Sequence, residues 1–181
     1  MHLSGSWGLR SGKMSVEIKL VATAKEMGVV AGLAKTIWNE HYVPIIGQAQ
    51  VDYMVEKYQT KEAIYGQIKN EGYQYFLVTV TGKPVGYIGI VEKNNELFLS
   101  KIYILGSERG KGLGRIGINY LVEKGKTDGL EFITLTVNKH NRSSIQAYEK
   151  MGFEKYGEVV SDIGSGYVMD DYLMRLRINI G

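Results

Sequence analysis

The chain has 181 residues and a formal net charge of +3, and 44% of its residues are hydrophobic, so it can bury its own core as one globular domain. It contains no cysteine, which excludes disulfides, cysteine-ligated zinc and a cysteine nucleophile and favours a reducing, cytoplasmic location. No apolar run reaches the roughly 18 residues of a membrane span, and no dense basic block is present, so we expect neither a membrane nor a nucleic-acid partner.

The first segment, residues 1–13, has no usable periodicity and lacks the apolar stretch of about 7–15 residues that a signal peptide needs. We interpret it as a leader or an expression remnant without ordered structure. No internal repeat or interdomain linker interrupts residues 14–181, which are therefore expected to form a single domain.

The first half of this domain is predicted to be mainly helical. Alternating apolar and charged residues predict a strand over residues 16–22, and Thr23 with Glu26 has the spacing of a helix-capping box. Apolar residues at helical spacing continue to Pro44, where we expect the helix to end. Two short helices are expected next, over residues 51–58 and 60–72.

The second half is predicted to be rich in strands. Turn-forming residues at 81–84 and 94–95 separate three strands that we expect to form an antiparallel meander. The expected strands are 73–80, 85–91, 97–105, 131–137, 153–159 and 167–178, and further helices are expected from residue 113 and over 141–151. This order predicts a mixed α/β (α+β) fold with a central, mostly antiparallel sheet flanked by helices.

A glycine-rich turn, residues 109–114, lies between a predicted strand and a predicted helix. Glycine lets the backbone approach a ligand closely, and the first N–H groups of a helix are available to bind an anion. Arg109, Lys111 and Arg115 add positive charge. A pyrophosphate is therefore the expected ligand, and an ordinary solvated turn is the alternative.

Two other phosphate motifs do not fit this turn. Residues 112–117 match G-x-G-x-x-G, but the preceding strand ends at Leu105 and the next strand ends in Asn138 rather than in an acid. The context of a dinucleotide-binding motif is therefore missing. A P-loop requires Ser or Thr after Gly-Lys, whereas Gly112 follows Lys111.

Further motifs follow at fixed offsets. One strand–helix–strand unit contains Val137-Asn138-Lys139-His140-Asn141, Ser144, Tyr148 and Gly152-Phe153. Together with the glycine-rich turn, this unit resembles the GNAT superfamily of acetyl-CoA-dependent N-acetyltransferases. The resemblance covers residues 16–178 in element order, and its specific motifs lie between Leu99 and Phe153.

The resemblance implies acetyl-CoA as co-substrate and a role for each matching position. Backbone groups of a strand would pair with the pantetheine arm, with a splay beyond Leu105, and the turn would cradle the pyrophosphate. The implied cofactor-binding residues are Ile102, Tyr103, Ile104, Arg109, Gly110, Lys111, Gly112, Leu113, Gly114 and Asn141. Tyr148 would be the catalytic general acid toward the departing sulfur, and no metal is implied.

These residues also have ordinary structural explanations. Asn141 suits a helix N-cap in any protein, and Tyr148 lies on the apolar side of its predicted helix with Ile145 and Met151. Gly152-Phe153 could be a helix stop followed by a buried aromatic residue.

The sequence departs from the family at the catalytic base. Many members carry a carboxylate on the strand before the turn, where this chain has Ser100 and Lys101. The base is therefore unassigned. The candidates lie in the helices that commonly form the acceptor side: Glu40, His41, Asp52 and Glu56.

The leading functional hypothesis is acetyl transfer to a small primary amine by direct attack in a ternary complex, which the lack of cysteine favours. Residues 99–104, 148–153 and 169–174 resemble bacterial polyamine N-acetyltransferases. A cationic acceptor would suit the acidic and aromatic residues of the expected pocket: Glu40, Asp52, Glu56, Asp170 and Asp171, with Trp38, Tyr42, Tyr53 and Tyr58. The alternatives are acetylation of a protein or peptide amine and a non-catalytic CoA-binding module, and a homodimer is left open.

Overall fold

The computed structural model describes residues 14–179, so the predicted leader at residues 1–13 lies outside the described residues. The described chain divides into two compact units, one of residues 14–91 and 101–120 and the other of residues 92–100 and 121–179. Strand β4 (Glu96–Ile104) and helix α4 (Leu113–Asp128) each contribute residues to both units.

The first unit is built on strands β1 (Val16–Leu20), β2 (Gln74–Val80) and β3 (Lys83–Lys93) and on the end of β4, which are neighbours in that order. β2 pairs antiparallel with both β1 and β3. The predicted turn between β2 and β3 is confirmed, because Thr81 and Gly82 adopt the positive φ angles of 49° and 77° that a tight hairpin requires.

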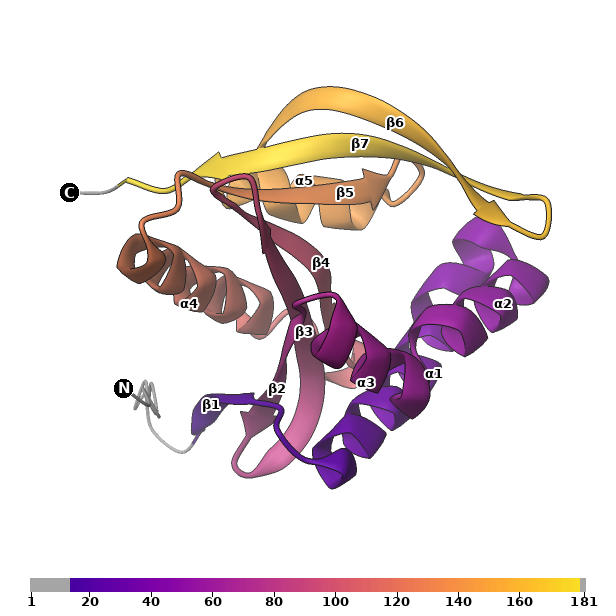
Figure 1. The fold of residues 1–181 in the computed structure, drawn as a ribbon, viewed down its shortest axis with the longest axis horizontal. Helices are drawn as coiled ribbons and strands as arrows, with labels where there is room; N and C mark the ends of the chain where they lie inside the picture. Colours follow the sequence, from indigo (N-terminus) through magenta and orange to yellow (C-terminus); the bar gives the residue numbers. More distant parts are fainter. Residues whose placement is uncertain (1–13, 180–181) are drawn as a thin grey trace. The chain divides into compact units, whose positions relative to one another are not determined.

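Three helices, α1 (Ala24–Ile46), α2 (Gln48–Tyr58) and α3 (Lys61–Asn70), lie on one side of β2 and β3 (Figure 1). Successive strand residues face opposite sides of a sheet. Tyr75 accordingly faces α3, where its hydroxyl donates to Gln67, whereas Phe76 contacts Tyr120 in the N-terminal half of α4 at a centroid distance of 5.4 Å. The core of this unit therefore lies on both faces of β2 and β3.

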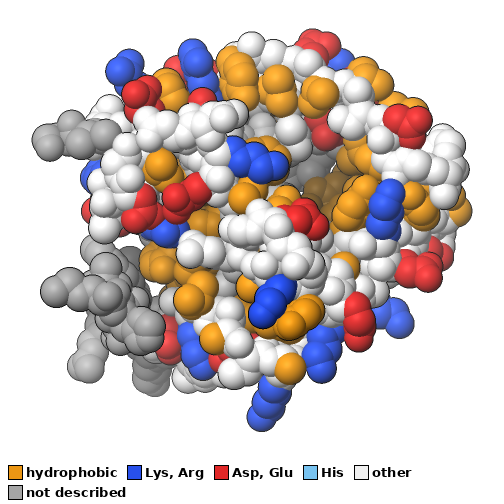
Figure 2. Space-filling model, viewed as in Figure 1, with side chains coloured by type: hydrophobic (Ala, Val, Ile, Leu, Met, Phe, Trp, Pro, Cys, Tyr) orange, Lys and Arg blue, Asp and Glu red, His pale blue; other side chains and the backbone are white. Residues whose placement is uncertain are grey.

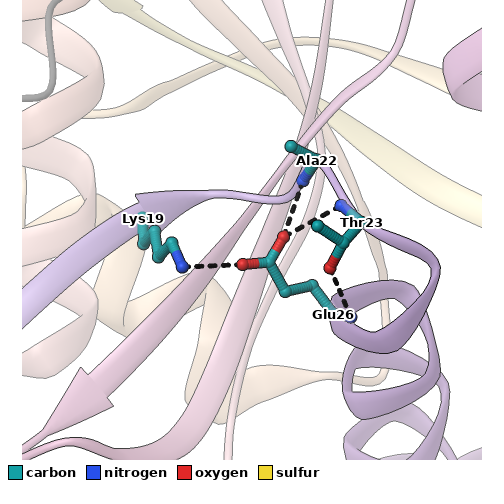
Figure 3. A network of polar contacts seen from close by, with 4 residues as sticks. All are labelled: Lys19, Ala22, Thr23 and Glu26. Carbon is teal, nitrogen blue, oxygen red and sulfur yellow. Dashed lines mark hydrogen bonds and ion pairs between the residues drawn. The ribbon is translucent and has the colours of Figure 1, made fainter.

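The predicted capping box at the start of α1 is confirmed (Figure 3). The Thr23 hydroxyl accepts a hydrogen bond from the Glu26 N–H at 3.2 Å, and Glu26 Oε2 accepts from the N–H groups of Ala22 and Thr23 at 2.9 and 3.0 Å. Glu26 also pairs with Lys19 at 2.7 Å. The Lys19 contact, followed by the two backbone donors, lowers the pKa of Glu26 to about 2.

The prediction that the first helix ends at Pro44 is wrong. Pro44 lies within α1, which continues to Ile46. Proline lacks an N–H group, so one bond of the last turn is missing, but the backbone keeps its helical path. The helix ends at Gly47, where φ is 84°. That positive φ angle suits glycine and marks the boundary between α1 and α2.

The second unit contains the start of β4, followed in strand order by β5 (Phe132–Asn138), β7 (Tyr167–Arg177) and β6 (Glu154–Gly164). β4 and β5 pair in parallel, and β7 pairs antiparallel with β5 on one side and β6 on the other. Helix α5 (Arg142–Lys150) connects β5 to β6 (Figure 1). Ile133, Leu135 and Met174 form the buried core of this unit. The predicted mixed α/β fold with mostly antiparallel strands and flanking helices is confirmed.

Two general properties follow from the described residues. Over residues 14–179, no helix is both long and apolar enough to cross a membrane. On the face that Figure 2 shows, basic and acidic side chains are interspersed rather than gathered by sign.

Candidate functional site

The turn between β4 and α4 has an open backbone surface. Ile116 is the first residue of α4 whose N–H bonds back into the helix, donating to the Gly112 carbonyl at 3.0 Å. The N–H groups of the three preceding helical residues therefore have no intrahelical acceptor and point out of the helix end. Gly110 and Gly112 have φ angles of 76° and 79°. A Cβ atom built on either of them, or on Gly114, would meet no heavy atom within 4 Å.

This geometry fits a pyrophosphate. A helix N-terminus attracts an anion through its N–H groups and its dipole, and the open side of the turn leaves room for phosphate oxygens. The backbone geometry from Arg109 to Gly114 is compatible with the predicted binding of the cofactor, which stays a prediction.

The end of β4, which carries Ile102, Tyr103 and Ile104, is held from two directions. A Cβ atom on Gly86 of β3 would lie 2.5 Å from the Tyr103 carbonyl oxygen, so glycine is what allows the two strands to approach so closely. On α1, Trp38 and Tyr42 contact the Tyr103 ring at centroid distances of 5.5 and 6.0 Å. These contacts hold the predicted pantetheine-binding strand in a defined position.

Two of the three basic side chains predicted beside the anion have partners within the protein. The Arg109 guanidinium donates through Nε to the Ile104 carbonyl at 3.2 Å and contacts His41 Nδ1 through Nη1 at 3.1 Å. Lys111 pairs with Glu108 at 2.8 Å. Arg115 is exposed on the first turn of α4.

Asn141 and Tyr148, the two predicted site residues of the second unit, both belong to α5 and its cap. Asn141 is buried and caps the helix, accepting from the Ser144 N–H at 3.4 Å, so its ordinary structural explanation is confirmed. Tyr148 is half-buried, and its ring contacts Phe153 at 5.4 Å. It is therefore not a fully buried core residue. Its role as general acid and the contact of Asn141 with the cofactor stay predictions.

A buried carboxylate with an unsatisfied oxygen lies on β7. Asp171 is only 8% exposed, and its Oδ1 has no hydrogen-bond partner among the described residues. Its neighbour Asp170 pairs with Lys139, as does Glu158, each at 2.7 Å. Burial, followed by the charge of Asp170, raises the pKa of Asp171 to about 6.

The residues predicted on the acceptor helices are largely engaged elsewhere. Glu40 and His41 contact the turn after β4, and Asp52 accepts a hydrogen bond from Gln48 at 2.8 Å. The rings of Tyr53 and Tyr58 both face the ammonium of Lys57, at 5.3 and 5.2 Å. Glu56 is exposed. Across residues 14–179, no group of three or more His, Cys, Asp or Glu side chains is arranged to hold a metal ion.

Sequence reasoning missed a buried polar network centred on Lys101. This lysine is 7% exposed, and its Nζ donates to Gln67 Oε1 at 2.9 Å and to the Tyr75 hydroxyl at 2.5 Å. Burial lowers the pKa of Lys101 to about 8. The alternation of Leu97, Leu99 and Lys101 along β4 was the signal that could have placed this side chain on a buried face.

The open glycine-rich turn before a helix is compatible with a phosphate-containing ligand. A profile of the acetyltransferase (GNAT) family matches residues 37–153. The chain therefore belongs to the acetyltransferase (GNAT) family, which confirms the predicted class of acetyl-CoA-dependent N-acetyltransferases.

Two curated relatives differ in how much of their length they share with this chain. The L-methionine sulfoximine/L-methionine sulfone acetyltransferase of Pseudomonas aeruginosa is 23% identical over 158 residues, covering 81% of this chain and 84% of that protein. An uncharacterised N-acetyltransferase of Methanocaldococcus jannaschii is 31% identical over 88 residues, which are 45% of this chain and 39% of that protein. The chain thus spans less than half of the second relative.

Solved structures share the fold over most of the chain. The PaiA N-acetyltransferase of Thermoplasma acidophilum in complex with coenzyme A has a TM-score of 0.74 at 17% identity, covering 90% of this chain and 99% of that one. The spermidine N-acetyltransferase of Vibrio cholerae in complex with CoA and spermine has a TM-score of 0.64 at 21% identity, covering 90% and 95%.

Proposed function

We propose that this chain transfers the acetyl group of acetyl-CoA to a small cationic primary amine, of the diamine or polyamine type, by direct attack in a ternary complex. The observation that carries the cationic acceptor is Asp171, a buried carboxylate with an oxygen that no described side chain satisfies. Similarity to the Vibrio cholerae enzyme, which was solved with spermine, supports the same acceptor class.

The electrostatics around Asp171 favour a cation. Lys139 pairs directly with Glu158 and Asp170, so its charge only partly offsets the burial of Asp171, which has no ion pair of its own among the described residues. A buried, unpaired carboxylate is costly, and an ammonium group at hydrogen-bond distance would offset that cost. Above a pH of about 6, Asp171 is ionised and is able to hold the ammonium.

The proposed chemistry needs no covalent enzyme intermediate, and the chain has no cysteine to form a thioacyl one. A neutral amine attacks the thioester carbonyl, so that a C–N bond forms and the C–S bond breaks. The amine loses one proton and the thiolate gains one. We assign the second proton transfer to the Tyr148 hydroxyl.

A panel of amines tests the acceptor class. CoA release is measured with spermidine, a diamine, methionine sulfone, glutamate and a short basic peptide as acceptors. Polyamines are expected to give the highest kcat/KM, and their advantage should shrink as salt screens charge attraction. Efficient turnover of methionine sulfone or glutamate, with none of polyamines at low salt, would contradict the cationic acceptor. Selective turnover of the peptide would favour a protein substrate.

Asp171→Asn tests the residue that carries the proposal. This variant keeps the shape of the side chain and removes its charge, so the polyamine KM should rise about tenfold, the scale of one charge-assisted contact, while the acetyl-CoA KM stays unchanged. In the wild type the polyamine KM should also rise as the pH falls below about 6, because Asp171 becomes neutral. Glu154→Gln, at an exposed carboxylate on β6, is the matched control.

A further inference from the structure

Helix α1 contacts the turn after β4 through two adjacent side chains. Glu40 Oε2 accepts a hydrogen bond from the Gly106 N–H at 3.2 Å, and His41 Nδ1 lies 3.1 Å from Nη1 of Arg109. Arg109 in turn bonds the carbonyl of Ile104 at 3.2 Å, at the last residue of β4. We name these four residues, Glu40, His41, Gly106 and Arg109, the α1 brace.

We infer that the α1 brace is a positioning device: Glu40 and His41 hold the turn and the end of β4 in the conformation that binds acetyl-CoA, and Arg109 serves this contact rather than the phosphates. The inference goes beyond the acceptor class and rests on the proposed place of acetyl-CoA at the turn. It reassigns Arg109 from ligand contact to positioning residue.

The geometry of Arg109 supports this reassignment. An arginine presents several N–H donors in a fixed planar fork, and here two of them are directed at atoms of the protein. One fork therefore links the last carbonyl of β4 to a helix 68 residues away in the sequence. The Nε donor and one Nη1 donor are thus occupied by the protein rather than by a phosphate.

Glycine at position 106 completes the contact. A Cβ atom there would lie 3.0 Å from Glu40 Oε2, so a larger residue would push the carboxylate away from the N–H group it accepts from. A carboxylate bonded to a backbone N–H is a charge-assisted contact, stronger than one between neutral groups. Glu40 and Arg109 thus hold the two ends of the same short segment, residues 106–109.

The His41 contact depends on protonation. Arg109 is a donor, so Nδ1 of His41 must be unprotonated to accept; a protonated ring offers no acceptor and places a second cation beside the guanidinium. Titratable or charged groups near this contact include Glu40 and Tyr42 on α1 and Glu108 and Lys111 on the turn. Protonation of His41 would therefore break its contact with Arg109.

Calorimetric titration with acetyl-CoA, in the absence of any amine, tests the inference. Arg109→Lys keeps the positive charge but not the fork, and His41→Leu removes the acceptor. Each substitution is expected to weaken acetyl-CoA binding about three- to tenfold. The double variant should bind acetyl-CoA as tightly as the single variant with the lower affinity, because both substitutions break the same contact. His41→Asn retains an acceptor close to the position of Nδ1 and should bind like the wild type. Thr36→Leu, on the exposed side of α1, is the matched control.

The pH profile gives a readout that a loss of packing would not change. Acetyl-CoA affinity of the wild type should fall more steeply on acidification than that of His41→Asn, because the imidazole can gain a proton and the amide cannot. Ionisation of the coenzyme phosphates affects both proteins equally and cancels in the comparison.

Several outcomes would overturn the brace. The inference is overturned by unchanged affinity in Arg109→Lys, by independent losses that add in free energy in the double variant, or by parallel pH profiles. Thermal unfolding without ligand identifies any variant that fails to fold. Because acetyl-CoA binding is measured without an acceptor, this test does not depend on whether the protein acetylates an amine. Normal acetyl-CoA affinity in Gly112→Val would show instead that the proposed turn is not the cofactor site.

Discussion

The buried Lys101 network gives a quantitative prediction about stability. Burial lowers the pKa of this lysine from 10.5 to about 8. Below pH 8 the lysine is protonated in both the folded and the unfolded chain. Between pH 8 and 10.5 the unfolded chain binds more protons, so the free energy of unfolding rises with pH. At about 1.4 kcal/mol per pH unit, the difference of roughly 2.5 pH units corresponds to about 3 kcal/mol.

Lys101→Met isolates this effect. Methionine is unbranched and neutral, and Tyr75 and Gln67 still bond each other without the lysine. Because the desolvation of a buried cation opposes folding, the variant is expected to be at least as stable as the wild type at pH 7. Its advantage should shrink by about 3 kcal/mol as the pH rises from 8 to 10.5. Burial also raises the pKa of Tyr75, so this phenol stays neutral throughout.

Urea unfolding of both proteins at intervals between pH 7 and 10.5 measures the difference in free energy at each pH. Titrations elsewhere in the chain cancel in the difference. Lys83→Met, at an exposed lysine of β3, is the control for the loss of a positive charge. If the curves of the wild type and Lys101→Met run parallel, Lys101 is not a desolvated cation and the reasoning is wrong.

Three further predictions follow from the described contacts. Tyr148→Phe deletes one hydroxyl, so kcat should fall about 10²–10⁴-fold while acetyl-CoA binding persists; wild-type turnover would remove its role as general acid. Glu26→Gln weakens the capping contacts of α1 and should lower the free energy of unfolding by about 1 kcal/mol at pH 7. Because the pKa of Glu26 is lowered to about 2 in the folded chain, the stabilisation by Glu26 should decrease as the pH drops below about 4.5, and the two proteins should be equally stable in strong acid. Gly112→Val and Gly82→Val place the same strain at φ angles of 79° and 77°, but only the former should weaken acetyl-CoA binding in titration calorimetry, and equal losses would refute the turn as the binding site.

Local patterns were sufficient to predict most helices and strands and the glycine-rich turn. The capping residues Thr23 and Glu26 act within one helical turn, so their spacing alone predicts their contacts. The glycines at 110 and 112 mark positive φ angles for the same reason, since the conformation of a turn is a property of neighbouring residues.

Contacts between distant segments were not predictable from such patterns. The position of β7 between β5 and β6 depends on which strands meet in the folded chain, not on any periodicity within the strand itself. The pairing of Arg109 with His41 and that of Lys101 with Gln67 join residues that are far apart in sequence. Asp171 was recognised as acidic, but its burial and its unsatisfied oxygen became visible only from its surroundings on β7.

The most direct test of the account is mass spectrometry of the acceptor after incubation of the protein with acetyl-CoA and spermidine, with CoA release measured in the same sample. The account predicts one mole of acetylated amine for each mole of CoA released, and strong loss of both in Asp171→Asn at low spermidine. Tight binding of acetyl-CoA without any acetylated product, for spermidine and for every other amine of the panel, would contradict it and leave a CoA-binding module.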